Sequence, residues 1–182
     1  FFAGIPGTMG GALAMNAGAY GGECWNFVRS VDVMARSGSC RTRRAAEYQV
    51  GYRRVTAPAN DEWFLAAELE FGPADPEATG AVRALAQRRK QTQPLGEWSC
   101  GSVFTNPPGD HAARLIEASG LKGHAIGGAR VSEKHANFIV NARGRGSAAD
   151  IEDLIQHVRK TVLAKHGVEL IAEVRIIGEA PA

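Results

Sequence analysis

Residues 100–107 read Cys-Gly-Ser-Val-Phe-Thr-Asn-Pro, and this stretch determines the local fold around the hydroxyl of Ser102. Gly101 allows the backbone a tight path in front of the serine. Pro107 biases Asn106 toward an extended conformation and stops a helix from running through. We therefore predict that Ser102 lies at the end of a strand or in a sharp turn. A Gly-Ser pair in a turn is often purely structural, so a functional role for Ser102 can be inferred only together with other segments of the chain.

A glycine-rich segment lies near the start of the chain, where residues 4–21 read GIPGTMGGALAMNAGAYG. Its first glycines let the backbone approach a ligand closely, and successive amides of such a loop form a concavity suited to a pyrophosphate. The spacing matches neither a P-loop nor the G-x-G-x-x-G dinucleotide fingerprint. A glycine-rich turn before a buried helix of small residues explains the same pattern, so both interpretations stay open.

A third motif, residues 134–141, reads KHANFIVN. Two basic residues lead into a short apolar run, which is typical of a buried strand with a solvated start.

Taken together and in their order along the chain, these motifs and the segments around them resemble the UDP-N-acetylenolpyruvoylglucosamine reductases. These are flavoenzymes that complete UDP-N-acetylmuramate in bacterial cell-wall synthesis. The matching segments are GIPGTMGGALAMNAGAYGGE, GYRR, RRKQTQPLGEWSCGSVFTNP, AARLIEASGLKGHAIGGARVSEKHANFIVN and AEVRIIG. The resemblance runs from Phe1 to about Gly178, and the spacing between Tyr52 and Arg89 is similar to that of the shorter subtype of the family. It implies a cytoplasmic, monomeric enzyme that uses FAD and NADPH and reduces the enolpyruvyl ether of a UDP-sugar.

The resemblance also implies the residues of the site. Three would be catalytic: Ser102 as the proton donor, Arg53 as the group that stabilises a developing enolate, and Glu173 as an acid or stabiliser near the same carbon. The implied cofactor-binding residues are Ile5, Pro6, Gly7, Thr8, Gly10, Gly11, Asn16, Gly18 and Ala19. The implied substrate-binding residues are Tyr52, Arg89, Asn106 and Lys122, with Lys134 and His135 as weaker candidates.

Local sequence alone offers simpler interpretations for two of the catalytic candidates. Arg53 stands beside Arg54 and fits an exposed basic pair. Glu173 and Arg175 fit one face of a strand, where an exposed ion pair contributes about 0–1 kcal/mol. The chain also departs from the family pattern, with Thr105 where a lysine commonly precedes Asn-Pro and Val55 where a serine is usual. These departures concern substrate affinity more than chemistry.

Family members carry a further N-terminal flavin-binding subdomain with a Gly-Gly-Gly-Ser-Asn type of phosphate loop, and nothing in this sequence matches it. The chain also opens at Phe1 without an initiator methionine. We therefore expect a fragment that binds FAD weakly by itself, and a truncated, non-catalytic UDP-sugar-binding module is the alternative function. A hydroxyacid oxidase of the same flavin-binding superfamily is a further alternative, but such enzymes lack the Ser-Val-Phe-x-Asn-Pro and Lys-His-Ala-Asn elements.

The pattern of elements predicts an α+β fold, with the C-terminal part of an FAD-binding domain (1–76) followed by a smaller substrate-binding domain (77–182). The Pro- and Gly-rich residues 72–76 mark the boundary. We expect strands at 28–36, 39–45, 62–71, 136–140 and 168–177, with Ser37-Gly38 as a hairpin turn. We expect helices at 77–90, at 111–119 with Asp110 as N-cap, and after Ser147, where Ser147 and Asp150 form a capping box and Gly167 ends the helix.

Composition limits the remaining function classes. The 182 residues are 45% hydrophobic and 22% charged, as in a globular protein, and the formal net charge of +2 gives no argument for nucleic-acid binding. No apolar run is long enough for a membrane span. The cysteines Cys24, Cys40 and Cys100 lack CxxC spacing, and five scattered histidines lack metal-site spacing, so we expect idle thiols and no metal.

Overall fold

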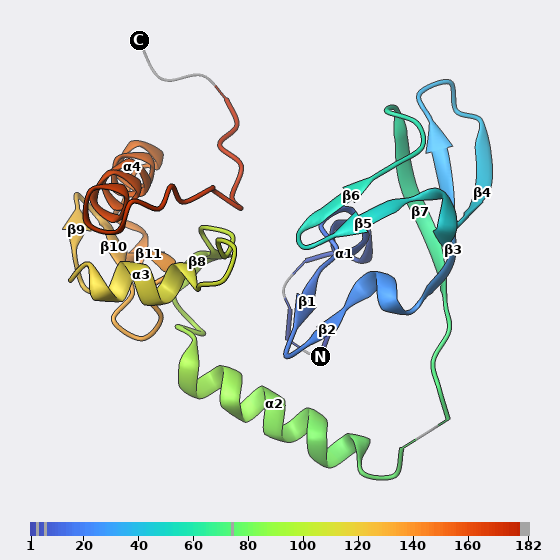
Figure 1. Ribbon diagram of the computed structural model, residues 1–182, viewed down its shortest axis with the longest axis horizontal. Coiled ribbons are helices and arrows are strands. Elements are labelled where there is room, and N and C mark those ends of the chain that lie inside the picture. Colours follow the sequence, from blue (N-terminus) through green and yellow to red (C-terminus); the bar gives the residue numbers. More distant parts are fainter. Residues whose placement is uncertain (3, 6, 74, 179–182) are drawn as a thin grey trace. The chain divides into compact units, whose positions relative to one another are not determined.

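The computed structural model describes residues 1–2, 4–5, 7–73 and 75–178. The chain divides into two compact units, Phe1–Gln87 and Arg88–Ala182. Both units combine helices and strands, which confirms the predicted α+β class (Figure 1). Helix α2 (Ala78–Thr92) crosses the division between the units, and the functional boundary after residue 76 stays a prediction.

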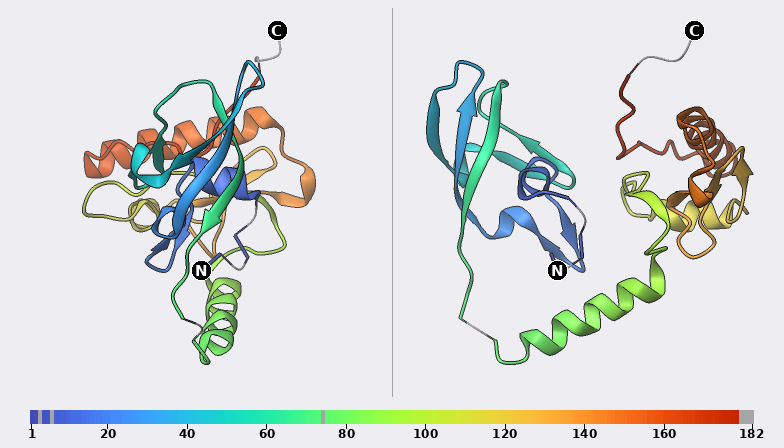
Figure 2. Two further views of the ribbon diagram at one scale, coloured as in Figure 1. Left: turned by 90° about the vertical axis from the view of Figure 1, so that its right-hand side faces the viewer. Right: turned by 180° about the vertical axis from the view of Figure 1, so that it is seen from behind.

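The first unit is built on the antiparallel sheet β4-β3-β7, formed by β3 (Val28–Ala35), β4 (Cys40–Arg44) and β7 (Glu62–Leu69). The turn between β3 and β4 contains Gly38 at φ +84°, so the predicted hairpin is confirmed. Alternate residues of β3, including Val31 and Val33, are buried in a cluster with Leu13 and Trp25. Figure 2 shows the long twisted β3–β7 ribbon from two sides.

Short elements around this sheet carry part of the predicted cofactor site, namely Gly10, Gly11, Gly18 and Ala19. These elements are α1 (Met9–Ala14), β1 (Gly18–Ala19), β2 (Gly22–Glu23), the 3-10 turns η1 (Cys24–Asn26) and η2 (Ala45–Glu47), β5 (Gln49–Gly51) and β6 (Arg54–Thr56). Strands β1 and β2 form one hairpin, and β5 and β6 form another.

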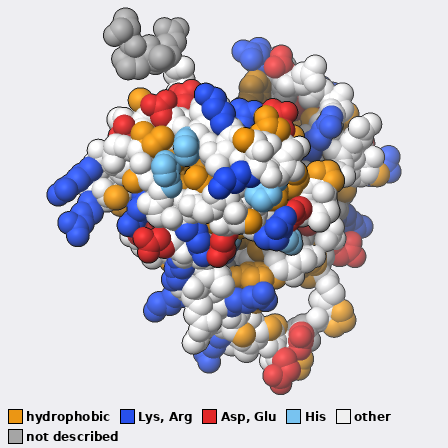
Figure 3. Space-filling view, turned by 60° about the vertical axis from the view of Figure 1, so that its left-hand side comes forward, with side chains coloured by type: hydrophobic (Ala, Val, Ile, Leu, Met, Phe, Trp, Pro, Cys, Tyr) orange, Lys and Arg blue, Asp and Glu red, His pale blue; other side chains and the backbone are white. Residues whose placement is uncertain are grey.

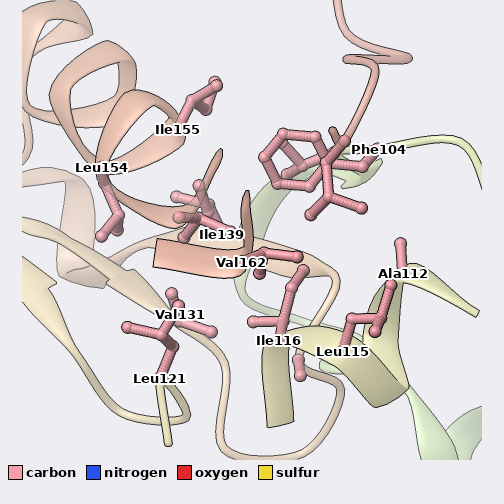
Figure 4. Packing of buried hydrophobic residues seen from close by; sticks show 14 of the residues in the cluster. Phe104, Ala112, Leu115, Ile116, Leu121, Val131, Ile139, Leu154, Ile155 and Val162 are labelled. Atoms are coloured by element: carbon pink, nitrogen blue, oxygen red, sulfur yellow. The ribbon is translucent and has the colours of Figure 1, made fainter. Parts of the chain in front are cut away.

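The second unit packs two helices against a four-stranded antiparallel sheet of order β8-β11-β10-β9. Its elements are β8 (Trp98–Ser102), α3 (Ala112–Ala118), β9 (Ala125–Ile126), β10 (Ala129–Val131), β11 (Phe138–Asn141), η3 (Ala142–Gly144) and α4 (Ala148–His166). Figure 4 shows the core, where Leu115 and Ile116 of α3 and Leu154 of α4 converge on Val131 and Ile139 of the sheet. Burial of these aliphatic side chains is the main stabilising contribution in this unit.

The ends of α4 follow the sequence signals. Ser147 Oγ accepts from the Asp150 amide at 3.1 Å, and Asp150 Oδ2 accepts from the Ser147 amide at 2.9 Å, which is the predicted capping box. Gly167 ends the helix in a left-handed conformation at φ +68°.

Two predictions in the second unit are wrong. Asp110 is not the N-cap of α3, because His111 occupies that position and the Asp110 carboxylate pairs with Arg114 one turn further on. The predicted strand at 168–177 reduces to one isolated bridge, Phe104 to Ala172. The amides of Glu173 and Val174 both donate to the carbonyl of Val103, at 2.8 and 3.4 Å, and this shared acceptor breaks the alternation that a ladder needs.

Ser102 ends strand β8, and Gly101 before it has φ +84°, as predicted. Lysine, arginine and carboxylate side chains alternate over the face shown in Figure 3, in keeping with the small net charge. Within the described residues, no helix combines the length and the apolar character needed to cross a membrane.

Candidate functional site

The glycine-rich loop of the first unit turns its backbone outward. Thr8 is the N-cap of α1, and its Oγ1 accepts from the Gly11 amide at 3.1 Å. A Cβ placed on Gly7 would meet nothing within 4 Å, and on Gly10 or Gly11 it would meet only Thr8 Oγ1, at 3.9 and 3.5 Å. Gly7 has φ +126°, a conformation that L side chains rarely adopt. The loop therefore leaves room for a ligand to approach its backbone directly.

The predicted cofactor loop also includes Ile5 and Pro6, of which only Ile5 lies within the described residues. Ile5 is half-buried, and its amide donates to the carbonyl of Phe2 at 3.0 Å. Pro6 lies outside the described residues.

Asn16 is completely buried and lies at the centre of a hydrogen-bond network. Its Nδ2 donates to Glu23 Oε2 at 2.8 Å and to the carbonyl of Gly51 at 3.1 Å. Its Oδ1 accepts from the Trp25 amide at 3.1 Å. The side chain thus joins β2, η1 and the β5–β6 hairpin, and its amide atoms are oriented toward protein groups. Direct contact between Asn16 and a cofactor remains a prediction.

Gly18 and Ala19 form strand β1, directly beside this network. A Cβ on Gly18 would come within 2.6 Å of the carbonyl oxygen of Gly22, so close packing of the two strands requires glycine at this position.

Arg53 lies in the turn between β5 and β6, with φ +52°. Its guanidinium donates to the carbonyls of Asn16 at 3.3 Å and Gly18 at 3.0 Å. It also lies 5.1 Å from the ring centroid of Tyr52, which is itself an exposed side chain. Arg53 is thus a half-buried, oriented cation rather than one of an exposed basic pair. A non-glycine residue held at positive φ costs about 1–3 kcal/mol and is often found at functional sites.

The segments that carry Ser102 and Glu173 are joined by backbone hydrogen bonds in the second unit. Ser102 pairs with Phe138 of β11, and the backbone directly after Ser102 bonds to Asn137 on one side and to residues 171–174 on the other. The carbonyl of Val103, the next residue, accepts from the Glu173 amide at 2.8 Å. The residue after Ser102 therefore shares a hydrogen bond with Glu173 itself, although 70 positions separate Val103 from Glu173 in the chain. Arg53, the third predicted catalytic residue, belongs to the other unit.

The predicted substrate-binding side chains of the second unit already contact neighbouring groups. Arg89 is buried, and its Nε donates to Gln93 Oε1 at 3.0 Å. Asn106 Oδ1 accepts from the amide of Ala112 at the start of α3, at 3.1 Å. Lys122 pairs with Glu117 at 2.9 Å, an exposed contact that a ligand anion can replace.

Of the weaker candidates, Lys134 donates through Nζ to the carbonyl of Lys90. His135 packs edge-on against Phe138, with 4.7 Å between ring centroids. Burial lowers the pKa of His135 below the ordinary histidine value, so the ring is neutral at pH 7.

Asn137 is a buried residue of the site that sequence reasoning did not single out. Its side chain accepts from the Phe104 amide at 3.0 Å and donates to the Phe104 carbonyl at 2.8 Å. The signal was available, because a polar residue stands inside the apolar run of the motif at 134–141. A buried polar side chain in such a run must have partners, but the sequence does not reveal which.

No cluster of three or more histidine, cysteine or acidic side chains suited to a metal ion occurs among the residues described. The three cysteines are free thiols, with Cys24 buried and Cys40 and Cys100 exposed. Burial raises the pKa of Cys24, so its thiol is protonated at pH 7.

Comparison with known proteins finds close relatives of this chain in both sequence and fold. Residues 93–177 match the family described as UDP-N-acetylenolpyruvoylglucosamine reductase, C-terminal domain. The chain belongs to the UDP-N-acetylenolpyruvoylglucosamine reductase family.

Individual relatives agree with this assignment. The chain is 60% identical over 181 residues to the UDP-N-acetylenolpyruvoylglucosamine reductase of Alkalilimnicola ehrlichii, covering 99% of this chain and 60% of the relative. It is 60% identical to that of Methylococcus capsulatus, covering 100% of this chain and 60% of the relative. The chain thus spans about three fifths of the length of these relatives.

A solved structure shows the same fold. The crystal structure of the UDP-N-acetylenolpyruvylglucosamine reductase from Thermus caldophilus aligns with a TM-score of 0.80 at 33% identity. The alignment covers 94% of this chain and 61% of that one.

Proposed function

We propose that the protein carrying this chain is an NADPH-dependent flavoenzyme that reduces UDP-N-acetylglucosamine enolpyruvate to UDP-N-acetylmuramate in peptidoglycan precursor synthesis. The relatives that cover almost the whole chain bear the name of this reductase. The observation that carries the proposal is the hydrogen bond from the Glu173 amide to the Val103 carbonyl, because it brings the serine strand and the glutamate segment together. Residues 1–76 would contribute to the FAD-binding domain and residues 77–182 would form the substrate-binding domain of a cytoplasmic monomer.

The residues of the first unit fit one side of an FAD site. The open backbone at Gly7 and Gly10 suits a pyrophosphate, because amide hydrogens can reach the phosphate oxygens where no side chain intervenes, whereas the Gly11 amide already donates to Thr8 Oγ1. Bound FAD would supply the hydride that reaches the methylene carbon of the substrate, with NADPH as the source of the electrons. Asn16 would support this site from behind by fixing the segments that surround it.

Ser102 would donate a proton to the substrate carbon that carries the carboxylate. Hydride addition to the methylene carbon moves the π electrons of the double bond onto that neighbouring carbon, and the new C–H bond there needs one proton. A serine hydroxyl is a weak acid in water and needs a dry, positively charged surrounding to act. Ser102 itself is half-buried, and the buried side chains of Val103 and Phe104 follow it directly.

Arg53 and Glu173 would act on the charge that develops during this step. The oriented guanidinium of Arg53 would stabilise the enolate, because a fixed cation costs no reorganisation when the charge appears. Glu173 would lie near the same carbon as an acid or a stabilising group.

The UDP-sugar would be bound by Tyr52, Arg89, Asn106 and Lys122, with Lys134 and His135 as additional contacts. Thr105 replaces the lysine common before Asn-Pro, and its hydroxyl donates to the carbonyl of Ile171 at 3.3 Å. The loss of that cation would lower affinity for the diphosphate rather than the rate of protonation. Val55, at the usual serine position, instead packs against the apolar cluster of the first unit.

The alternative function is a non-catalytic UDP-sugar-binding module. The test uses the complete protein that carries this sequence, purified and examined for flavin absorbance and for NADPH oxidation. We expect a flavin spectrum, and NADPH oxidation that depends on UDP-N-acetylglucosamine enolpyruvate. Binding of the UDP-sugar without flavin and without turnover would support the alternative and refute the reductase.

A further inference from the structure

We propose that Asn137 is a positioning residue that holds Ser102 and Glu173 in register for the protonation step. The proposal rests on the proposed reductase function. Asn137 is 4% exposed, and its carboxamide bonds to both backbone polar groups of one residue, Phe104. The contact imitates the paired hydrogen bonds of a strand.

The backbone of Asn137 adds a third bond to the same segment. Its carbonyl accepts from the Val103 amide at 2.9 Å. Asn137 thereby fixes the amide of Val103 and both polar groups of Phe104, the two residues that follow Ser102. While these three bonds persist, the backbone directly after Ser102 stays beside Asn137.

The same segment holds Glu173 on its other side. The carbonyl of Val103 accepts from the Glu173 amide, and the Thr105 amide donates to the carbonyl of Ile171 at 3.0 Å. Residues 103–105 thus form a central strand-like bridge between Asn137 and the glutamate segment. A shift of this bridge would move Ser102 relative to Glu173.

Asparagine suits this role chemically because it offers a donor and an acceptor on one short side chain. Aspartate has the same shape but would place a second acceptor against the carbonyl of Phe104. Leucine or alanine would leave the Phe104 amide, a buried group, without a partner.

Asn141, the last residue of the strand that follows Asn137, supplies a matched control. Its Nδ2 donates to the Gly146 carbonyl at 2.9 Å, and its Oδ1 accepts from the Gly146 amide at 2.8 Å. This is the same two-bond pattern to a single residue, but it holds the loop before α4 rather than the segment after Ser102. Asn141→Asp therefore removes the same kind of contact elsewhere in the unit.

The experiment measures the two half-reactions of the complete protein by stopped flow. Asn137→Asp is expected to slow flavin reoxidation by the enolpyruvyl substrate by about 10–100-fold, since a small misplacement of a reacting group costs rates of this order. Flavin reduction by NADPH should stay within about twofold, and Asn141→Asp should leave reoxidation unchanged. In the Ser102→Ala background, Asn137→Asp should add little further loss, because both changes act on the same step.

Three results would overturn the proposal: equal slowing of both half-reactions, equal effects of the Asn137 and Asn141 variants, or multiplicative effects of Asn137→Asp and Ser102→Ala. If Asn137→Asp fails to fold by circular dichroism, Asn137→Ser, which keeps one donor, is measured with the same expectations. A wild-type protein that binds no flavin, or whose reduced flavin the substrate does not reoxidise, would refute the reductase function itself. These outcomes are distinguishable, because the wild-type protein alone decides the second.

Discussion

Substitutions of Asn16 test the buried network that orients Arg53. Asn16 has φ +43°, in the left-handed region that asparagine tolerates and alanine does not. Removing its side chain also leaves the Trp25 amide, a buried donor, without a partner. The Glu23 carboxylate and the Gly51 carbonyl are less buried and can be rehydrated.

The magnitudes follow from these two effects. Loss of the partner of a buried amide costs about 1–3 kcal/mol, so Asn16→Gly should lower the free energy of unfolding by that amount. Asn16→Ala should cost about 1–2 kcal/mol more, because it adds the strain of a left-handed Cβ. Glycine should therefore be the more stable substitution, as is usual directly after a helix C-cap and opposite to the order in a helix interior.

The assay is urea unfolding of the chain in a Trp98→Phe background, where fluorescence reports on Trp25 and Trp63 of the first unit. Both variants lose the same side-chain hydrogen bonds, so the difference between their free energies of unfolding reports on the strain of the left-handed backbone at residue 16. Equal stability of the Gly and Ala variants, or a loss below about 0.5 kcal/mol for both, would refute the reasoning about strain and buried partners.

Two further predictions concern the second unit. Ser147→Ala removes the hydroxyl that accepts from the Asp150 amide in the α4 capping box, and it should lower the free energy of unfolding by about 1 kcal/mol. An unchanged urea midpoint would contradict the capping role of Ser147. Burial, the nearby charge of His124 and that of Lys160 lower the pKa of His157, whose ring stacks on His124 at 4.4 Å between centroids. The imidazole of His157 therefore binds a proton more readily in the unfolded chain, so the stability that it contributes above pH 6.5 should be lost as the pH falls below this value. The urea midpoints at pH 7.5 and pH 5.5 should differ less in the His157→Gln variant than in the wild type. An equal difference in both proteins would contradict the assignment of this pH dependence to His157.

Local sequence signals predicted the elements that depend on local physics. The capping box of Ser147 and Asp150, the stop at Gly167 and the turn at Gly38 all concern residues within a few positions of one another. Gly101 likewise indicated the strand end at Ser102. Such signals act through backbone conformation and adjacent hydrogen bonds, which the sequence states directly.

Predictions failed where other groups, some near in the sequence and some distant, compete for the same polar atoms. Asp110 has the chemistry of an N-cap, but Arg114 attracts its carboxylate and Asn106 bonds to the Ala112 amide. The apolar run at 168–177 suggested a strand, but the carbonyl of Val103 accepts two of its amides. Pairings of this kind depend on tertiary packing, which overrides local propensity.

The residues of the candidate site stay a prediction, and the sequence did not indicate the contacts that support them. The resemblance to a family pointed to Ser102, Arg53 and Glu173, whereas nothing in the sequence indicated that Asn16 bonds to Gly51 or that Asn137 bonds to Phe104. Each of these contacts joins residues more than thirty positions apart. A buried amide can be found in a sequence, but its partners require the fold.

The most direct test of the proposed function is the Ser102→Ala variant of the complete protein, followed by stopped flow in each half-reaction. The hydroxyl is needed only to protonate the substrate carbon, so flavin reduction by NADPH should keep its wild-type rate. Reoxidation by the enolpyruvyl substrate should slow by about 10²–10⁴-fold, the usual cost of losing a general acid. Slow flavin reduction with unchanged reoxidation would contradict the account and would indicate that Ser102 positions the nicotinamide instead.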